Sequence, residues 1–270
     1  MRLAIDHVTH YRFSGPLKHG LQRLRLTPKH TSGQRVVKWD MVFEGARLEV
    51  EYEDHNYNHV SLVSIDEGAS EMTIRCTGLV DTADESGIIG RHSGFLPLWH
   101  FLRPTELTKA GPKLRALLGE VDRGGDPLPM LHALSAAIRD AVTYETGQTH
   151  SATTSEEALD AGHGVCQDHA HIFIAACRAM DIPARYVSGY LMMDDRVEQD
   201  AGHAWAEAHV DHIGWIGFDI SNGISPDARY VRIATGSDYR EAAPVTGIRF
   251  GAHEEELHVS LAVEQQRMEQ

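Results

Sequence analysis

The sequence predicts an α+β fold, in which a β-sandwich-like N-terminal domain precedes a core with a cysteine-bearing helix packed on an antiparallel sheet. Three observations support this prediction. The first eighty-odd residues alternate between apolar and polar side chains without a helical period. A helical run begins at Cys166, and two alternating segments joined by a short turn follow it at residues 203–210 and 215–220. Alternation with a period of two indicates half-buried strands, and the short connection indicates a hairpin.

The N-terminal third is predicted to form a domain over residues 1–85. Apolar side chains alternate along residues 37–43, 48–52 and 72–76, and turn-forming residues occupy positions 54–58. Several short strands separated by turn signals are typical of a β-sandwich or a barrel.

Residues 86–107 change in composition, because glycine and proline recur among them together with aromatic residues. We predict a packed connector there. A helix is expected over residues 108–118, and a second begins at Pro129, where apolar side chains recur at helical spacing. The catalytic core is predicted to extend over residues 108–270 and to include a last strand at residues 257–263.

Cys166 lies in the first turn of the predicted central helix, which continues to Met180 and stops before Pro183. The unpaired N–H groups and the positive end of the helix dipole favour an anion at this position, so a thiol loses its proton more easily. The thiolate is the nucleophile in cysteine catalysis. A free cysteine is also commonly a small buried hydrophobe. Cys166 alone therefore leaves catalysis and packing equally open.

The downstream strands supply the partners that favour catalysis. His203 opens the first strand and Asp219 lies near the end of the second. Their side chains point the same way only if the turn holds an odd number of residues or a bulge intervenes. Asp219 would then accept one imidazole proton while the other ring nitrogen faces Cys166. This is the arrangement of nucleophile, base and orienting group in a catalytic triad.

Four blocks resemble the core of the transglutaminase-like superfamily. They are Gly164-Val-Cys166-Gln-Asp168, Asp181-Ile-Pro-Ala-Arg185-Tyr-Val-Ser-Gly-Tyr190, His203-Ala-Trp-Ala-Glu207, and Gly214-Trp215 with Phe218-Asp219. The resemblance implies a papain-like core in which Cys166, His203 and Asp219 are catalytic. One departure is Ile220-Ser221, where relatives commonly carry Pro and Thr after the aspartate. The carboxylate itself is in place.

The N-terminal part resembles the domain that precedes this core in the bacterial branch. The segments that carry this resemblance are Leu3 to Tyr11, Leu24 to Pro28 and Asp54 to Asn58. Members of that branch are often labelled "putative cysteine protease", a label that leaves the substrate open. The resemblance thus spans nearly the whole chain.

Four further residues are candidates for the site. Tyr144 and Gln167 are candidates for the oxyanion site or the substrate cleft. Trp205 and Trp215 would wall the cleft and shield the contact between His203 and Asp219 from water. Separately, burial of Arg185 at the sheet would require a carboxylate partner.

Composition argues against several classes of partner. The formal net charge of −14 argues against nucleic acid or an anionic membrane as the main partner. Three widely spaced cysteines argue against a disulfide scaffold and suit a reducing compartment. A charge interrupts the first six residues, where a signal peptide would need an apolar run, so we expect a cytoplasmic protein. No cofactor is indicated, and the oligomeric state stays open.

Eighteen histidines raise the question of a metal site. The spacings HExxH and CxxC are absent from the sequence. His169 and His171 are two apart on a predicted helix and point in different directions. We therefore predict no metal.

The expected activity is cysteine-dependent acyl transfer on peptide or isopeptide bonds through a thioester, with hydrolysis favoured over transamidation. The expected partner is a peptide or protein substrate. One alternative is an acyl-CoA-dependent N-acyltransferase, which would need a basic cofactor groove. A noncatalytic binding module of the same fold and a metalloprotein are the others.

Overall fold

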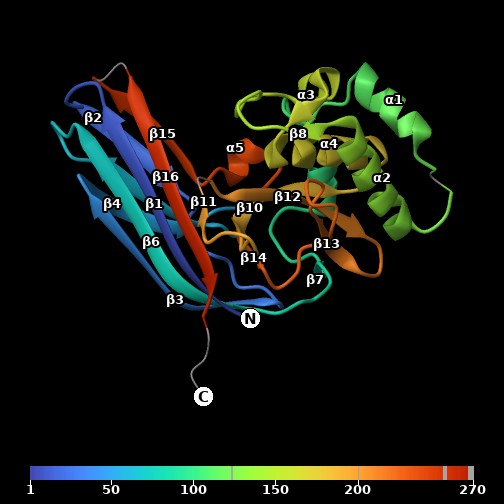
Figure 1. Cartoon of the computed structure of the whole chain (residues 1–270), viewed down its shortest axis with the longest axis horizontal. Helices are drawn as coiled ribbons and strands as arrows, with labels where there is room; N and C mark the ends of the chain where they lie inside the picture. The colour runs from blue at the N-terminus through green and yellow to red at the C-terminus, as the bar shows by residue number, and fades with distance from the viewer. Residues whose placement is uncertain (123, 200, 252–253, 267–270) are drawn as a thin grey trace.

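A β-sandwich lies beside a core of helices and sheet in the computed structural model, which describes residues 1–122, 124–199, 201–251 and 254–266 (Figure 1). This is the α+β architecture that the sequence predicts. Among the described residues, no helix is long and apolar enough to cross a membrane.

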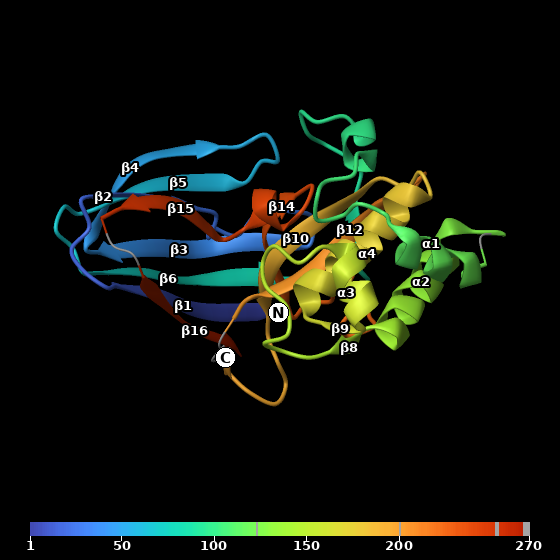
Figure 2. The ribbon, with the colours of Figure 1, turned by 90° about the horizontal axis from the view of Figure 1, so that it is seen from above.

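Two facing sheets form the sandwich. Its strands are β1 (Arg2–Phe13), β2 (His19–Leu24), β3 (Gln34–Glu44), β4 (Ala46–Glu53), β5 (His59–Ile65), β6 (Glu71–Thr82), β11 (Glu198–Gln199), β15 (Val245–Phe250) and β16 (Glu255–Gln265). One sheet has the order β11-β16-β1-β6-β3 and the other has the order β15-β2-β5-β4. Figure 2 shows them as separate layers. The core between them contains Phe13, Leu24, Val63 and Ile74.

The second half is built on a sheet of order β14-β10-β12-β13-β7. Its elements are β7 (Ile88–Gly90), the 3-10 helix η1 (Leu98–Leu102), α1 (Pro112–Glu120), α2 (Pro127–Ala141), β8 (Thr143–Tyr144), α3 (Ser155–Ala161), β9 (His163–Gly164), α4 (Cys166–Ala179), β10 (Ala184–Leu191), β12 (His203–Val210), β13 (Gly214–Phe218), β14 (Tyr230–Gly236) and α5 (Tyr239–Ala242). Helix α4 packs on one face of this sheet. The small side chains Ala204, Ala206 and Ala208 of β12 share the α4 core and permit close packing.

The C-terminal strands differ from the sequence expectation, which assigned the last strand to the core over residues 108–270. Instead β16 pairs antiparallel with β1, and β15 pairs antiparallel with β2. Alternation identifies a buried face but does not reveal which strand edge receives the pairing. The chain therefore leaves the sandwich after β6, builds the core and returns to the sandwich. The helix expected over residues 108–118 begins later, at Pro112.

Strand β1 holds the two halves together. Leu3 and Ile5 pack in the hydrophobic core that contains α4, whereas Tyr11 and Phe13 pack inside the sandwich. Between them, His7 Nδ1 lies 2.7 Å from the hydroxyl of Tyr190 in β10. This shared strand places the sandwich directly beside the start of α4.

Candidate active site

Cys166 is the first residue of α4, and its side chain is partly exposed. The carboxylate of Asp168 accepts hydrogen bonds from the Val165 N–H at 2.8 Å and from the Thr149 hydroxyl at 2.6 Å. A Cβ added at Gly164 would lie 2.8 Å from the Asp168 side chain, so this close turn requires glycine. These contacts fix Cys166 at the helix end, where backbone N–H groups have no intrahelical acceptor.

The β12–β13 hairpin brings the histidine and the aspartate to one face of the sheet. Val210 pairs with Gly214, so the turn holds three residues, the odd number that this geometry requires. His212 in the turn has a φ of 69°, in the left-handed region. Glu207 pairs with Gly217, and alternation from this pair places His203 and Asp219 on the same face.

His203 and Asp219 are in direct contact. The Nε2 atom of His203 lies 2.6 Å from Oδ2 of Asp219, which is fully buried. This oxygen also accepts the Tyr230 hydroxyl at 2.6 Å and the Asn222 side-chain amide at 2.7 Å. With Nε2 committed to the carboxylate, Nδ1 is the ring nitrogen that remains for Cys166, which is near enough to raise the pKa of the imidazole.

The electrostatics of the pair favour a charged imidazole. Burial would raise the pKa of Asp219, but hydrogen bonds from His203, Tyr230 and Asn222 hold it below its ordinary value. Burial would likewise lower the pKa of His203, but hydrogen bonds to Asp219 and Cys166 and their charges raise it to about 10. An imidazolium beside the thiol stabilises the thiolate.

Tyr144 and Gln167 flank the cysteine in different ways. Strand β8 pairs in parallel with β9, which sets Tyr144 beside Gly164, two residues before Cys166. Burial, together with the charges of Cys166 and Asp219, raises the pKa of Tyr144, so its phenol remains a donor. The side-chain amide of Gln167 donates to the Ser151 carbonyl at 3.3 Å and is thereby engaged by a neighbouring loop.

The two candidate tryptophans, Trp205 and Trp215, lie at opposite ends of the hairpin. The Trp205 ring lies 6.2 Å from the His203 ring and 5.4 Å from that of Tyr230, measured between centroids, so Trp205 adjoins the site. Trp215 pairs instead with His209, at the far end of the hairpin. Six residues of strand span about 20 Å. The expectation that Trp215 shields the His203–Asp219 contact is therefore wrong, because alternation gives the face but not the distance along it.

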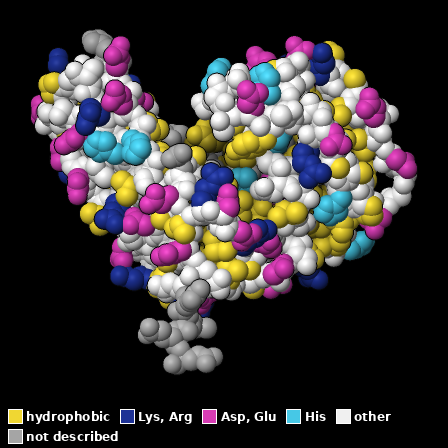
Figure 3. Space-filling model, viewed as in Figure 1, with side chains coloured by type: hydrophobic (Ala, Val, Ile, Leu, Met, Phe, Trp, Pro, Cys, Tyr) yellow, Lys and Arg dark blue, Asp and Glu magenta, His cyan; other side chains and the backbone are white. Residues whose placement is uncertain are grey.

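Cys166 opens into a cleft of about 310 Å³ between the two halves. The core contributes Cys166, His203 and Tyr190 to its lining, and the sandwich contributes Tyr11 and Val259. Figure 3 shows the molecule hollowed between the sandwich and the helical half. The sandwich thus forms one wall of the cleft.

Tyr230 and Asn222 contact the buried carboxylate but were not identified from the sequence. Asn222 stands before Gly223, and such a dipeptide is a turn signal that could have placed it near Asp219. Tyr230 belongs to β14, which is separated from β13 by two strands in the sheet. Its contact with Asp219 therefore depends on the tertiary arrangement.

The histidines near Cys166 form internal hydrogen bonds. His169 Nε2 lies 2.9 Å from the Val142 carbonyl, and its Nδ1 lies 2.8 Å from the Ser221 hydroxyl. His171 accepts the Tyr239 N–H, and burial lowers its pKa to about 3. The described residues contain no group of three or more His, Cys, Asp or Glu placed to hold a metal.

Arg185 has the carboxylate partner that its burial requires. Its Nε lies 2.6 Å from Oε2 of Glu207, which is fully buried. Arg232 also pairs with Glu207, through Nε at 2.7 Å and Nη2 at 2.9 Å. The pair that the sequence suggested is therefore one half of a three-residue ionic cluster.

Comparison with known proteins finds a matching protein family for each half of the chain. Residues 115–220 match the model of the transglutaminase-like superfamily, and residues 3–81 match that of the bacterial transglutaminase-like N-terminal region. An uncharacterized protein of Mycobacterium leprae is 26% identical over 97% of this chain and 98% of its own. An uncharacterized protein of Mycobacterium bovis is 30% identical over 92% of this chain and 87% of its own.

A solved structure has the same fold over the whole chain. "The Crystal Structure of a Putative Cysteine Protease from Cytophaga hutchinsonii" superposes with a TM-score of 0.78 at 23% identity and covers 100% of this chain and 92% of that one. The two proteins therefore share their overall fold. Together with the two family models, these matches show that the chain belongs to the transglutaminase-like superfamily.

Proposed function

We propose that this protein is a cysteine-dependent acyl-transfer enzyme that cleaves peptide or isopeptide amide bonds through a thioester, with hydrolysis favoured over transamidation. One observation carries the proposal. At an open cleft, a partly exposed thiol at a helix start lies near an imidazole whose Nε2 is held by a fully buried carboxylate. A noncatalytic binding module would not need a fully buried Asp219 behind His203 at the mouth of its cleft.

The first half-reaction follows from the placement of these groups. The Cys166 thiolate attacks the carbonyl carbon of the scissile amide. The Cys166 backbone N–H donates to the developing oxyanion, an interaction typically worth about 3 kcal/mol of barrier. The Tyr144 phenol is the candidate second donor. The His203 imidazolium gives its Nδ1 proton to the leaving nitrogen, the C–N bond breaks, and a thioester remains on Cys166.

Water completes the cycle. His203, now neutral, takes a proton from water as the hydroxide adds to the thioester carbonyl, and the proton returns to the leaving sulfur as the acid departs. Asp219 holds the ring in one orientation throughout and stabilises each imidazolium that forms. Replacement of water by a primary amine would give transamidation through the same steps. We favour water because the described residues that line the cleft form no recognisable amine site.

The proposed substrate is a peptide or protein. The cleft is formed by backbone and side chains of both halves and includes the apolar residues Leu26, Tyr186 and Val259. Such a wall suits an extended peptide segment next to the scissile bond. Cys76, Cys166 and Cys177 are all free thiols. A reducing compartment such as the cytoplasm suits this state.

The test is activity profiling of the full chain on peptide and isopeptide libraries, with and without a primary amine donor. We expect release of the acid product by the wild type and complete loss in Cys166→Ala. The matched control is Cys177→Ala, which removes a thiol buried in the same helix and should retain activity. Mass spectrometry should detect an acyl group on Cys166. Equal turnover by Cys166→Ala and wild type would refute the proposal, and amine incorporation without hydrolysis would replace hydrolysis by transamidation.

A further inference from the structure

A second cavity, of about 710 Å³, lies on the other side of the core sheet. It is lined by the loop after β2, the β4–β5 turn and Trp215. Arg185 stands between Ala184 and Tyr186, which pack towards α4, so it projects from the opposite face into this cavity. Within the described chain, no residue lines both this cavity and the Cys166 cleft.

Two buried guanidinium groups each have an open edge at this cavity, meaning N–H groups that donate to no acceptor in the described chain. Arg185 and Arg232 have side chains only 11% and 8% exposed, and both pair with Glu207. Arg185 uses only its Nε atom for this pair, and Arg232 uses Nε and Nη2. The Nη1 and Nη2 groups of Arg185 and Nη1 of Arg232 donate to no protein acceptor in the described parts of the chain. Free N–H groups of this kind match the oxygens of a carboxylate or a phosphate.

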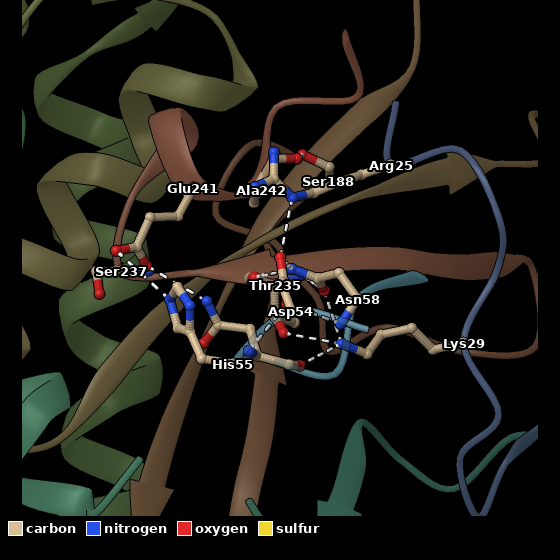
Figure 4. A network of polar contacts seen from close by, with 11 residues as sticks. Arg25, Lys29, Asp54, His55, Asn58, Ser188, Thr235, Ser237, Glu241 and Ala242 are labelled. Atoms are coloured by element: carbon tan, nitrogen blue, oxygen red, sulfur yellow. Dashed lines mark hydrogen bonds and ion pairs between the residues drawn. The ribbon is translucent and has the colours of Figure 1, made fainter. Parts of the chain in front are cut away.

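Lys29 contributes an amine to this cavity, and none of the described carboxylates forms an ion pair with it. Its ammonium donates to the Asn58 side-chain oxygen at 2.7 Å and to the Thr235 hydroxyl at 3.2 Å (Figure 4). It also donates to the Asn56 carbonyl at 2.7 Å, so all three acceptors are neutral. The nearby Asp54 is paired with Arg25 instead. Burial, together with Arg232 and Arg185, lowers the pKa of Lys29 well below its usual range. An anion in the cavity would oppose this effect.

The local charge balance runs against that of the protein as a whole. Lys29, Arg91, Arg185 and Arg232 line the cavity, against the lining carboxylate Glu53 and the buried Glu207. Even without Lys29, whose pKa is lowered, three arginines against two carboxylates leave an excess of one positive charge, in a chain whose formal net charge is −14. The volume also lies in the range of small-molecule sites, about 300–1,000 Å³.

We propose that this cavity binds a small, multiply charged oxyanion, held by the open edges of Arg185 and Arg232 over the ring of Trp215. The guanidinium carbon of Arg185 lies 4.0 Å from the Trp215 ring centroid, which fixes the plane of its fork. Phosphate and polycarboxylate groups share the required chemistry. The site is separate from Cys166 and does not depend on the proposed peptidase activity.

The test is isothermal titration calorimetry of the full chain with pyrophosphate and, separately, citrate, at constant ionic strength set with sodium chloride. The key variant is Arg185→Met, because Arg232 still holds Glu207 through two hydrogen bonds. The matched control is Arg75→Met, which removes an exposed guanidinium paired with Asp6. We expect one site, weakened about tenfold or more by Arg185→Met and unchanged in Arg75→Met.

The remaining titrations identify the location of the site and the class of ligand. Binding should be unchanged in Cys166→Ala, and loss in that variant would overturn the proposal by locating the anion in the other cleft. Tighter binding of pyrophosphate identifies a phosphate ligand, and tighter binding of citrate identifies a polycarboxylate. If Arg185→Met does not fold, Arg185→Lys keeps the charge, loses the fork and should also weaken binding. Failure of both probes to bind at about 1 mM, or equal binding by the folded Arg185 variant and wild type, would overturn the site.

Discussion

Replacement of Asp219 by Asn should uncouple His203 from Cys166 while keeping the shape of the side chain. The carboxylate accepts hydrogen bonds from three side chains and is fully buried. The amide retains similar volume but removes the negative charge behind the imidazole. The variant therefore separates the electrostatic effect from a change in packing.

The size of the effect follows from the pKa of His203. That pKa is raised from 6.5 to about 10, which corresponds to roughly 5 kcal/mol in favour of the imidazolium. Burial opposes this stabilisation, and Asp219 heads the groups that offset burial, so loss of its charge should return the pKa of His203 towards its ordinary value or below it. The direction of the pH dependence is that of a histidine whose pKa is raised in the folded protein. The stabilisation is fully present below pH 6.5 and is lost as pH rises through about 10.

The assay is the rate of iodoacetamide labelling of Cys166 at pH 6, followed by mass spectrometry of the cysteine peptide. An ordinary thiol has a pKa of about 8.5 and is almost entirely protonated there, so reactivity at this pH depends on the imidazolium. The other thiols do not interfere, because both are buried and burial raises the pKa of Cys76 to about 12 and that of Cys177 further. We expect Asp219→Asn to be labelled more slowly than wild type, by about tenfold or more, because less imidazolium remains beside the thiol at this pH.

The matched control is Asp227→Asn, which makes the same chemical change in a nearby loop. Asp227 pairs with Arg229 at 2.7 Å and has no contact with His203 among the described residues. This control should be labelled at the wild-type rate. If Asp219→Asn, shown to be folded by circular dichroism, is labelled as fast as Asp227→Asn between pH 5 and pH 8, the electrostatic reasoning fails.

Three further predictions test Tyr144 as an oxyanion donor, the ionic cluster around Glu207, and the pairing of β16 with the sandwich. Tyr144→Phe should lower kcat about a hundredfold with little change in KM, measured on any substrate found by profiling; an unchanged kcat would exclude the phenol as a donor. Glu207→Gln should destabilise by about 3–5 kcal/mol in urea unfolding, because two guanidiniums remain buried without their carboxylate, whereas the exposed control Glu49→Gln should change little. Burial would raise the pKa of Glu207, but both arginines lower it to about 2, so wild type should lose its advantage over Glu207→Gln as pH falls from 4.5 towards 2. Deletion of β16 should destabilise by about 3 kcal/mol or more, because Leu261 and Val263 are almost fully buried on it; a truncated chain as stable as the full one would contradict this.

Local sequence features were enough for much of the site. The glycines before Cys166 and the apolar run after it predicted the helix start, and the alternation after His203 predicted the hairpin. The parity condition on the turn could be stated from the sequence, and the three-residue turn meets it. These features are local because each depends on residues within one element or one turn.

Contacts between distant elements could not be obtained in this way. Tyr230 reaches Asp219 across two intervening strands, and Lys29 reaches Thr235 from the opposite end of the chain. Trp215 shares the face of His203 but lies at the far end of the hairpin, in another cavity. Periodicity carries no information on the distance between elements or on the order of strands in a sheet.

The sequence by itself determined the class of fold, the helix that carries Cys166 and the strands that carry His203 and Asp219, because periodicity and turn chemistry act over a few residues. Only the tertiary structure decided that β16 closes against β1, that the sandwich walls the cleft, and that Arg185, Arg232 and Lys29 converge behind the sheet. These outcomes depend on edge pairing and burial between segments far apart in the chain; Leu3 and its strand partner Gln265 are 262 residues apart. Over such distances the partner is selected by shape and charge rather than by neighbouring sequence.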